Sequence, residues 1–86
     1  MTNPQLFDTI ATLQPLPLDR LQLTEPEIDR LGQLPIGQVG TIVEIYTTPT
    51  EPHYLIEFAD LQGCAYAIST LQAQEFLLLH YELTAA

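Results

Sequence analysis

Hydrophobic and polar positions alternate with a period of two through much of the second half of the chain, which predicts β-strands. Residues 38–46 are the clearest case, because one face of such a strand would carry Val39, Thr41, Val43 and Ile45. Residues 53–58 alternate in the same way and place Tyr54, Ile56 and Phe58 together. A loop rich in Thr and Pro joins the two segments. We therefore predict a hairpin in which these two sets of side chains pack against each other, so that Val43→Asp would unfold the domain.

The rest of the second half predicts two more strands. Asp60 and Gly63 occupy the first and fourth positions of a type I turn, after which residues 63–68 would return as a strand. Ser69 or Thr70 could then cap a single helical turn over residues 71–75. Residues 76–83 would form the last strand, with Leu77 and Leu79 on one face and Phe76 and Leu78 on the other.

The first half of the chain is less regular. Residues 6–13 mix β-branched and aromatic side chains and predict a first short strand. Four prolines then interrupt a leucine-rich segment that we interpret as a long excursion up to Pro35. Within it, Thr24 and Glu27 have the spacing of a capping box, which predicts a short helix over residues 25–31 that ends at Gly32.

Together these elements predict an all-β fold: a small SH3-like barrel of four to five antiparallel strands with a long loop and one short helical turn. An α+β arrangement is the alternative. The length of 86 residues allows one modest core, so we expect residues 1–86 to form a single domain.

The chain also resembles a known family. The resemblance rests on the sequence GQVGTIVEIY at residues 37–46, on YLIEFAD at residues 54–60, and on Gly63, Tyr66 and Thr70. Residues 6–11, LFDTIA, look like the opening strand of the same family. It is the bacterial, often cyanobacterial, family catalogued as domain of unknown function four-nine-two-six. The resemblance implies a small β-barrel and supplies no catalytic residues.

Charge narrows the range of partners. The chain contains eleven acidic residues, two arginines and no lysine, which gives a formal net charge of −9. Nucleic acids and anionic membranes attract clustered Lys and Arg, so we expect neither as a partner. The single cysteine, Cys64, cannot form an intramolecular disulfide, and no targeting or membrane-spanning segment is recognisable, which favours the cytoplasm.

Candidate chemistry is weak. Gly37 and Gly40 have the spacing of a phosphate-binding loop, but they precede a strand and no lysine follows them, which favours a turn and a close backbone approach. The residue types of a nucleophile, a base, an orienting acid and metal ligands are scattered, as Cys64, His53, His80, Glu57, Asp60 and Glu82. We predict no enzyme activity, no metal, no cofactor and no small-molecule substrate.

The functional hypothesis is a non-enzymatic module that binds another protein or its own copy through the long excursion and an adjoining apolar edge. Two groups of residues form the candidate partner surface: the acidic Glu25, Glu27 and Asp29, and the apolar Phe76 and Leu78. Cover of Phe76 and Leu78 from within the domain is the other interpretation of that apolar face. An antitoxin or immunity-type protein that neutralises a basic enzyme is the alternative function.

Overall fold

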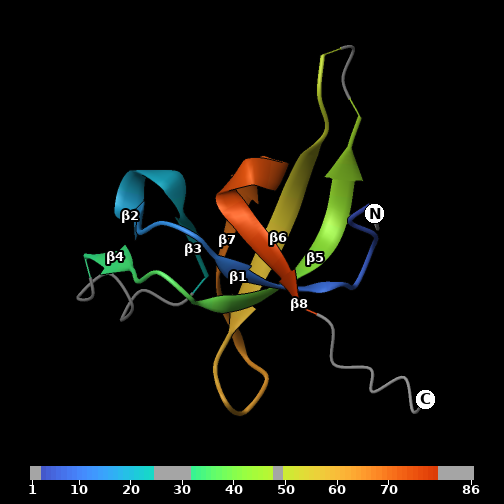
Figure 1. The fold of residues 1–86 in the computed structure, drawn as a ribbon. Helices are drawn as coiled ribbons and strands as arrows, with labels where there is room; N and C mark the ends of the chain where they lie inside the picture. The colour runs from blue at the N-terminus through green and yellow to red at the C-terminus, as the bar shows by residue number, and fades with distance from the viewer. Residues whose placement is uncertain (1–2, 25–31, 48–49, 80–86) are drawn as a thin grey trace.

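The computed structural model describes residues 3–24, 32–47 and 50–79. These residues form five strands of four residues or more, three strands of two residues and two 3-10 turns (Figure 1). The longer strands are β1 (Thr9–Thr12), β5 (Val39–Tyr46), β6 (His53–Ala59), β7 (Ala65–Leu71) and β8 (Phe76–Leu79). The short ones are β2 (Leu16–Pro17), β3 (Gln22–Leu23) and β4 (Gln33–Leu34), and the turns are η1 (Leu18–Arg20) and η3 (Ala73–Glu75). The predicted all-β class is confirmed.

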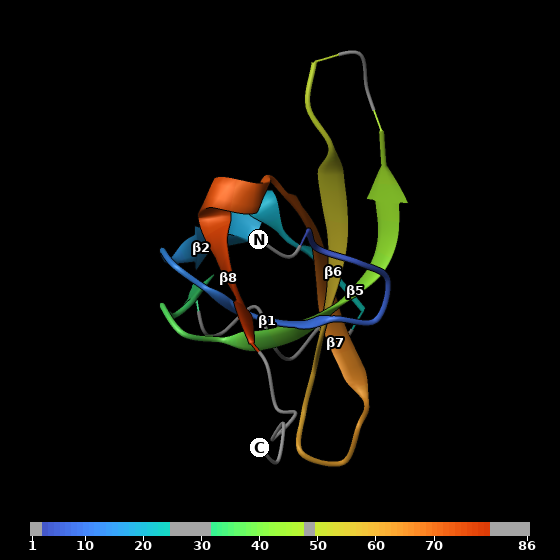
Figure 2. The same ribbon diagram turned by 45° about the vertical axis from the view of Figure 1, so that its right-hand side comes forward.

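Six of the strands form one antiparallel sheet in the order β3-β7-β6-β5-β1-β8, and β2 pairs separately with β4. Strands β5, β6 and β7 follow one another as a meander of two hairpins. Strand β1 runs at a steep angle to β6 and β7 in both views, and β8 crosses the direction of β6 in Figure 1 (Figures 1 and 2). The sheet is therefore strongly coiled, and its two halves pack on a shared core.

That core draws on every longer strand and on the excursion. The prediction that Tyr54, Ile56 and Phe58 share a buried face is confirmed. The Tyr54 ring meets the ring of Phe76 edge to face, with centroids 5.4 Å apart. The buried apolar residues are Ile10, Leu16, Leu34, Ile42, Tyr54, Ile56, Phe58, Tyr66, Ala67, Leu71 and Phe76.

The inward face of β5 is not the predicted one. Ile42 is fully buried, whereas Val39 is 45% exposed. The pairing with β6 shifts register between Ile42 and Glu44, and beyond this bulge Ile45 packs partly against the core. The prediction that Val39, Thr41 and Val43 face inward is therefore wrong.

Gly40 explains why the alternation in β5 is misleading. A Cβ atom at this buried position would lie 2.6 Å from Cγ2 of Ile56 and 2.9 Å from Cε1 of Phe58. These two side chains fill the space that a side chain at position 40 would need. Because glycine has no side chain, the sequence does not mark position 40 as part of the apolar inner face of β5, although the position is buried against Ile56 and Phe58. The expected close approach at Gly40 is confirmed.

The predicted β6–β7 turn is confirmed, but its neighbours differ. The backbone N–H of Gly63 donates to the carbonyl of Asp60 at 2.9 Å, and Gly63 has a φ of 82°. Strand β7 continues through Ser69 and Thr70, so the prediction that one of them caps a helical turn is wrong. The 3-10 turn η3 is instead held by Glu75. Its Oε1 accepts a hydrogen bond from the backbone N–H of Gln72 at 2.9 Å, and its own backbone N–H donates to the Gln72 carbonyl at 2.9 Å.

The excursion is more structured than predicted. Leu16 and Leu34 pair across β2 and β4 and are both buried in the core. Strand β3 joins the far edge of the sheet through its pairing with β7. The helix predicted over residues 25–31 lies outside the described residues.

Candidate functional site

An exposed apolar surface lies on the outer face of β5, β1 and β8. The strand register places Val39, Ala11 and Leu77 side by side in one row, and Thr41, Thr9 and Leu79 in the next. Paired residues in an antiparallel sheet project from the same face. Three strands far apart in the sequence therefore contribute to one surface.

Burial confirms which side of these strands faces solvent. Leu77 is 53% exposed and Val39 is 45% exposed, and Leu13, one residue beyond β1, is 50% exposed. In the alternate positions, Ile10 is fully buried opposite Gly40 and Leu78. We call the surface formed by Ala11, Leu13, Val39, Leu77 and Leu79 the apolar outer face.

Acidic charge lies beside this face. Glu57 on β6 pairs with Thr41 and so continues the second row beyond β5. No Lys or Arg side chain lies in the two rows. Arg20 is the only Lys or Arg among the described residues, and its guanidinium is paired with the carboxylate of Glu75. The apolar outer face is thus bordered by negative charge.

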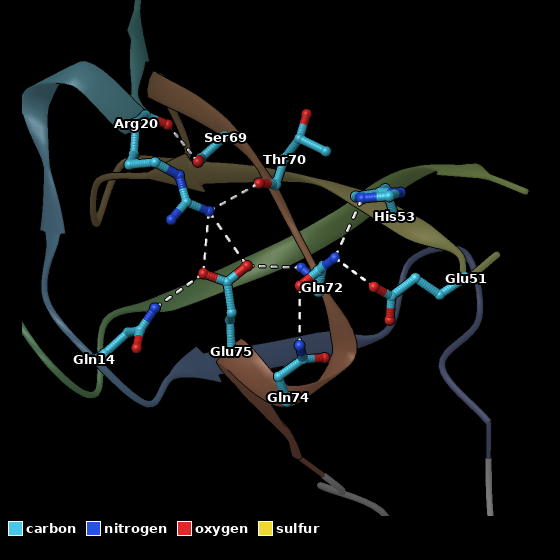
Figure 3. Close-up of polar contacts among 9 residues, drawn as sticks. All are labelled: Gln14, Arg20, Glu51, His53, Ser69, Thr70, Gln72, Gln74 and Glu75. Carbon is cyan, nitrogen blue, oxygen red and sulfur yellow. Dashed lines mark hydrogen bonds and ion pairs between the residues drawn. The ribbon is translucent and has the colours of Figure 1, made fainter. Parts of the chain in front are cut away.

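Glu75 is the centre of a polar cluster that fixes the start of β8 (Figure 3). Its carboxylate accepts hydrogen bonds from Nη2 of Arg20 at 3.0 and 3.2 Å, from Nε2 of Gln14 at 2.9 Å and from the backbone N–H of Gln72 at 2.9 Å. The same Nη2 of Arg20 donates to the carbonyl of Thr70 at 3.3 Å. These contacts tie β1, η1 and the end of β7 to the turn from which β8 begins.

We expect Glu75→Ala to lower the free energy of unfolding by about 1–2 kcal/mol, because it removes the acceptor that caps η3. Arg20→Ala should cost less than about 1 kcal/mol, since the Arg20 side chain is 40% exposed and exposed ion pairs contribute little. Urea unfolding of the two variants measures the difference. An equal loss in both would show that the ion pair, and not the cap, holds η3.

A second polar contact lies at the other end of η3. Nε2 of Gln72 donates to Oε1 of Glu51 at 2.7 Å and lies 3.5 Å from Nε2 of His53. Oε1 of Gln72 accepts a hydrogen bond from Gln74 at 2.9 Å (Figure 3). These hydrogen bonds join η3 to the β5–β6 loop and therefore stabilise the position of the loop relative to the turn.

An open groove of about 340 Å³ lies between η1 and the strands β6 and β7. Its lining includes Asp19, Arg20, Leu55 and Ile68. The guanidinium of Arg20 is held by Glu75, and the Ser69 hydroxyl donates to the Arg20 carbonyl. The cationic group of the groove is therefore already neutralised within the protein.

Of the scattered reactive residues that the structure describes, Asp60 meets the backbone of Cys64 at the β6–β7 turn, whereas His53 lies far from both. His53 begins β6, whereas Cys64 is exposed and follows the turn at the opposite end of that strand. A seven-residue strand spans roughly 20 Å at about 3.3 Å per residue. No group of three or more His, Cys, Asp or Glu that could hold a metal occurs among the described residues. His80 and Glu82 lie outside them.

The turn around Cys64 is held by its neighbours. Oδ1 of Asp60 accepts hydrogen bonds from the backbone N–H groups of Gln62 and Cys64, both at 2.9 Å. Burial raises the pKa of the Tyr66 hydroxyl above its usual value, and the nearby carboxylate of Asp60 adds to the effect. Asp60 thus has a structural role in closing the β6–β7 hairpin.

The structure describes two residues of the predicted partner surface, Phe76 and Leu78. Phe76 is 5% exposed and lies in the core against Tyr54, which corrects its placement on an exposed surface. Leu78 is half-buried on the same inner face, opposite Ile10. Cover from within the domain is the correct interpretation of this face of β8. Glu25, Glu27 and Asp29 lie outside the described residues.

Sequence reasoning missed the exposed Leu13, Val39 and Leu77 of this face, together with the half-buried Ala11 and Leu79. The alternation in residues 76–79 already grouped Leu77 with Leu79. Choosing this group required knowing that Phe76 packs on Tyr54, which is a contact between distant segments.

Fold and surface define the class of protein as a small antiparallel all-β protein with a coiled sheet and an apolar outer face. The profile of one protein family, described as "Domain of unknown function (DUF4926)", matches residues 6–78. The chain belongs to this family, as its sequence resemblance implied. No curated protein and no solved structure gave a significant match. No helix in the described part of the chain is long and apolar enough to cross a membrane.

Proposed function

We propose that this protein is a non-enzymatic interaction module that binds a basic partner protein through its apolar outer face. The observation that carries the proposal is the gathering of Leu13, Val39 and Leu77 on adjacent strands, each about half exposed. Apolar patches on the surface of a small soluble protein are typical of binding sites. Truncation of a central apolar side chain in such a site commonly weakens binding by more than about 1 kcal/mol.

Charge supports a basic partner. The net charge of −9 repels a second copy of the chain and other acidic proteins, and it attracts a partner rich in Lys or Arg. Glu57, at the border of the apolar outer face, would lie near such residues. The apolar contacts would hold the complex, while the charge would speed and orient its formation.

We expect Leu77→Gln to weaken capture of the partner at least tenfold, because it places a polar side chain at the centre of the contact. The matched control is Leu61→Gln, since Leu61 is fully exposed in the β6–β7 turn, away from the apolar outer face. Quantitative affinity capture from the source organism, followed by titration of the purified partner, measures both. Equal binding by the two variants would contradict the proposal.

Varying the salt concentration in the same titration distinguishes the apolar contribution to binding from the electrostatic one. The affinity should fall as salt rises from low to physiological concentration, since exposed charges are screened beyond about 8 Å at physiological ionic strength. The effect of Leu77→Gln should persist at high salt. Binding that does not depend on salt would refute the basic partner and leave the apolar contact.

The antitoxin or immunity-type function is the narrower form of this proposal, in which the basic partner is an enzyme that loses activity in the complex. We also place the protein in the cytoplasm, where the exposed thiol of Cys64 would stay reduced. Activity assays of the captured partner, with and without the protein, test the narrower form.

A further inference from the structure

The open edge of β8 is the feature from which we infer how the partner binds, and this inference rests on the proposed function. Among the described residues, β8 ends the six-stranded sheet and pairs only with β1 (Figure 2). The backbone N–H of Leu13 donates to the carbonyl of Glu75 at 3.0 Å. This bond fixes which β8 residues bond to β1.

Residues of an antiparallel pair alternate between hydrogen-bonded and non-hydrogen-bonded positions. Leu13 and Glu75 form a hydrogen-bonded pair. Leu77 and Leu79 lie two and four residues after Glu75, so their backbone N–H and C=O groups also point toward β1. The backbone groups of Leu78 therefore point away from β1. The N–H of Phe76 also points away but is bonded to the carbonyl of Ala73, which leaves the Phe76 carbonyl and both groups of Leu78 along the open edge.

Apart from its short length of four described residues, this edge lacks the devices that normally prevent pairing with another chain. Proteins protect edge strands with charged side chains, proline or a β-bulge. The sequence of β8 is FLLL, without a charge or a proline, and its register with β1 is continuous. The outward side chains Leu77 and Leu79 extend the apolar outer face to the edge itself.

We propose that β8 accepts a strand from the partner, an extended segment with alternating apolar and basic residues. Its backbone would pair with Phe76 and Leu78, and its apolar side chains would lie beside Leu77 and Leu79. Its Lys or Arg side chains would lie on the opposite face of the added strand, beside the half-buried Leu78, where their apolar stems can pack while their charges reach water and are attracted by the acidic protein. Two copies of this chain would instead bring two net charges of −9 together, which disfavours β8 pairing with itself.

The sequence permits a direct test of the backbone contact. Gly63 precedes Cys64 in an exposed turn, so native chemical ligation can join residues 1–63 to a synthetic peptide of residues 64–86. The synthetic half carries N-methyl-leucine at position 78, which removes the edge N–H and leaves the Leu78 side chain unchanged. The ligated protein with ordinary leucine is the control, and thermal melting should show that both are folded.

The probe is an acetylated peptide of alternating valine and lysine, titrated into isotope-labelled protein and followed by NMR. We expect the Leu78 amide to shift and its hydrogen exchange to slow on addition of the peptide. N-methylation at position 78 should weaken binding at least tenfold. A peptide of alternating valine and glutamate should not bind.

The outcomes separate this inference from the proposed function. Loss of binding in both the N-methyl protein and Leu77→Gln supports both. Loss in Leu77→Gln alone keeps the apolar outer face as the binding surface and overturns strand addition. Unchanged binding in both, equal binding of the glutamate peptide, or a dimer formed through β8 without the peptide also overturns it.

Discussion

Ile42→Asp should unfold the protein, whereas Val43→Asp should leave it folded. Ile42 is fully buried and pairs with Ile56, which is fully buried as well. A carboxylate without a partner at this position costs several kcal/mol. The total stability expected for a chain of this length is only roughly 4–13 kcal/mol, from about 0.05–0.15 kcal/mol per residue.

Val43 differs because it lies at the bulge and is only half-buried. Its aspartate can reach water, so the loss should stay near 1 kcal/mol, the typical cost of a substitution. Circular dichroism and thermal melting of the two variants decide the matter. A cooperative melt for Ile42→Asp together with an unfolded Val43→Asp would restore the inward face predicted from the alternation.

Gly40→Ala should lower the free energy of unfolding by about 1–3 kcal/mol, which is a large effect for the addition of one methyl group. The new Cβ would lie 2.6 Å from Cγ2 of Ile56 and 2.9 Å from Cε1 of Phe58. Both side chains are fully buried and cannot move aside without disturbing the core. The neighbouring Thr41→Ala, on the outer face, is the control and should cost clearly less.

A double-mutant cycle identifies the cause. Ile56→Ala removes the Cγ2 atom, so the added cost of Gly40→Ala should shrink in that background. Urea titrations in sucrose keep the weaker variants folded enough to measure. If the cost of Gly40→Ala is the same in both backgrounds, the close approach to Ile56 is not its origin.

Local patterns determined a large part of this fold. The β5–β6 hairpin, the turn from Asp60 to Gly63 and the short turn before β8 all follow from the residues that form them. Each depends on alternation over a few positions or on the turn preference of particular residues, such as glycine at a φ of 82°. The family resemblance likewise depended on the sequence alone.

Tertiary structure decided which face of each strand is buried. Alternation defines two faces but does not rank them when both carry apolar residues, as in β5 and β8. The bulge after Ile42 and the packing of Phe58 on Gly40 reverse the expected face of β5. The contact between Tyr54 and Phe76 does the same for β8.

The candidate site depended on tertiary structure even more strongly. Its central row joins Val39, Ala11 and Leu77, which only the pairing of β1 with both β5 and β8 brings together. The sequence shows that each of these residues is apolar, and its net charge of −9 is the reason for proposing a basic partner. Their grouping at an open edge follows from strand register, because register is set by contacts between distant segments and not by local preference.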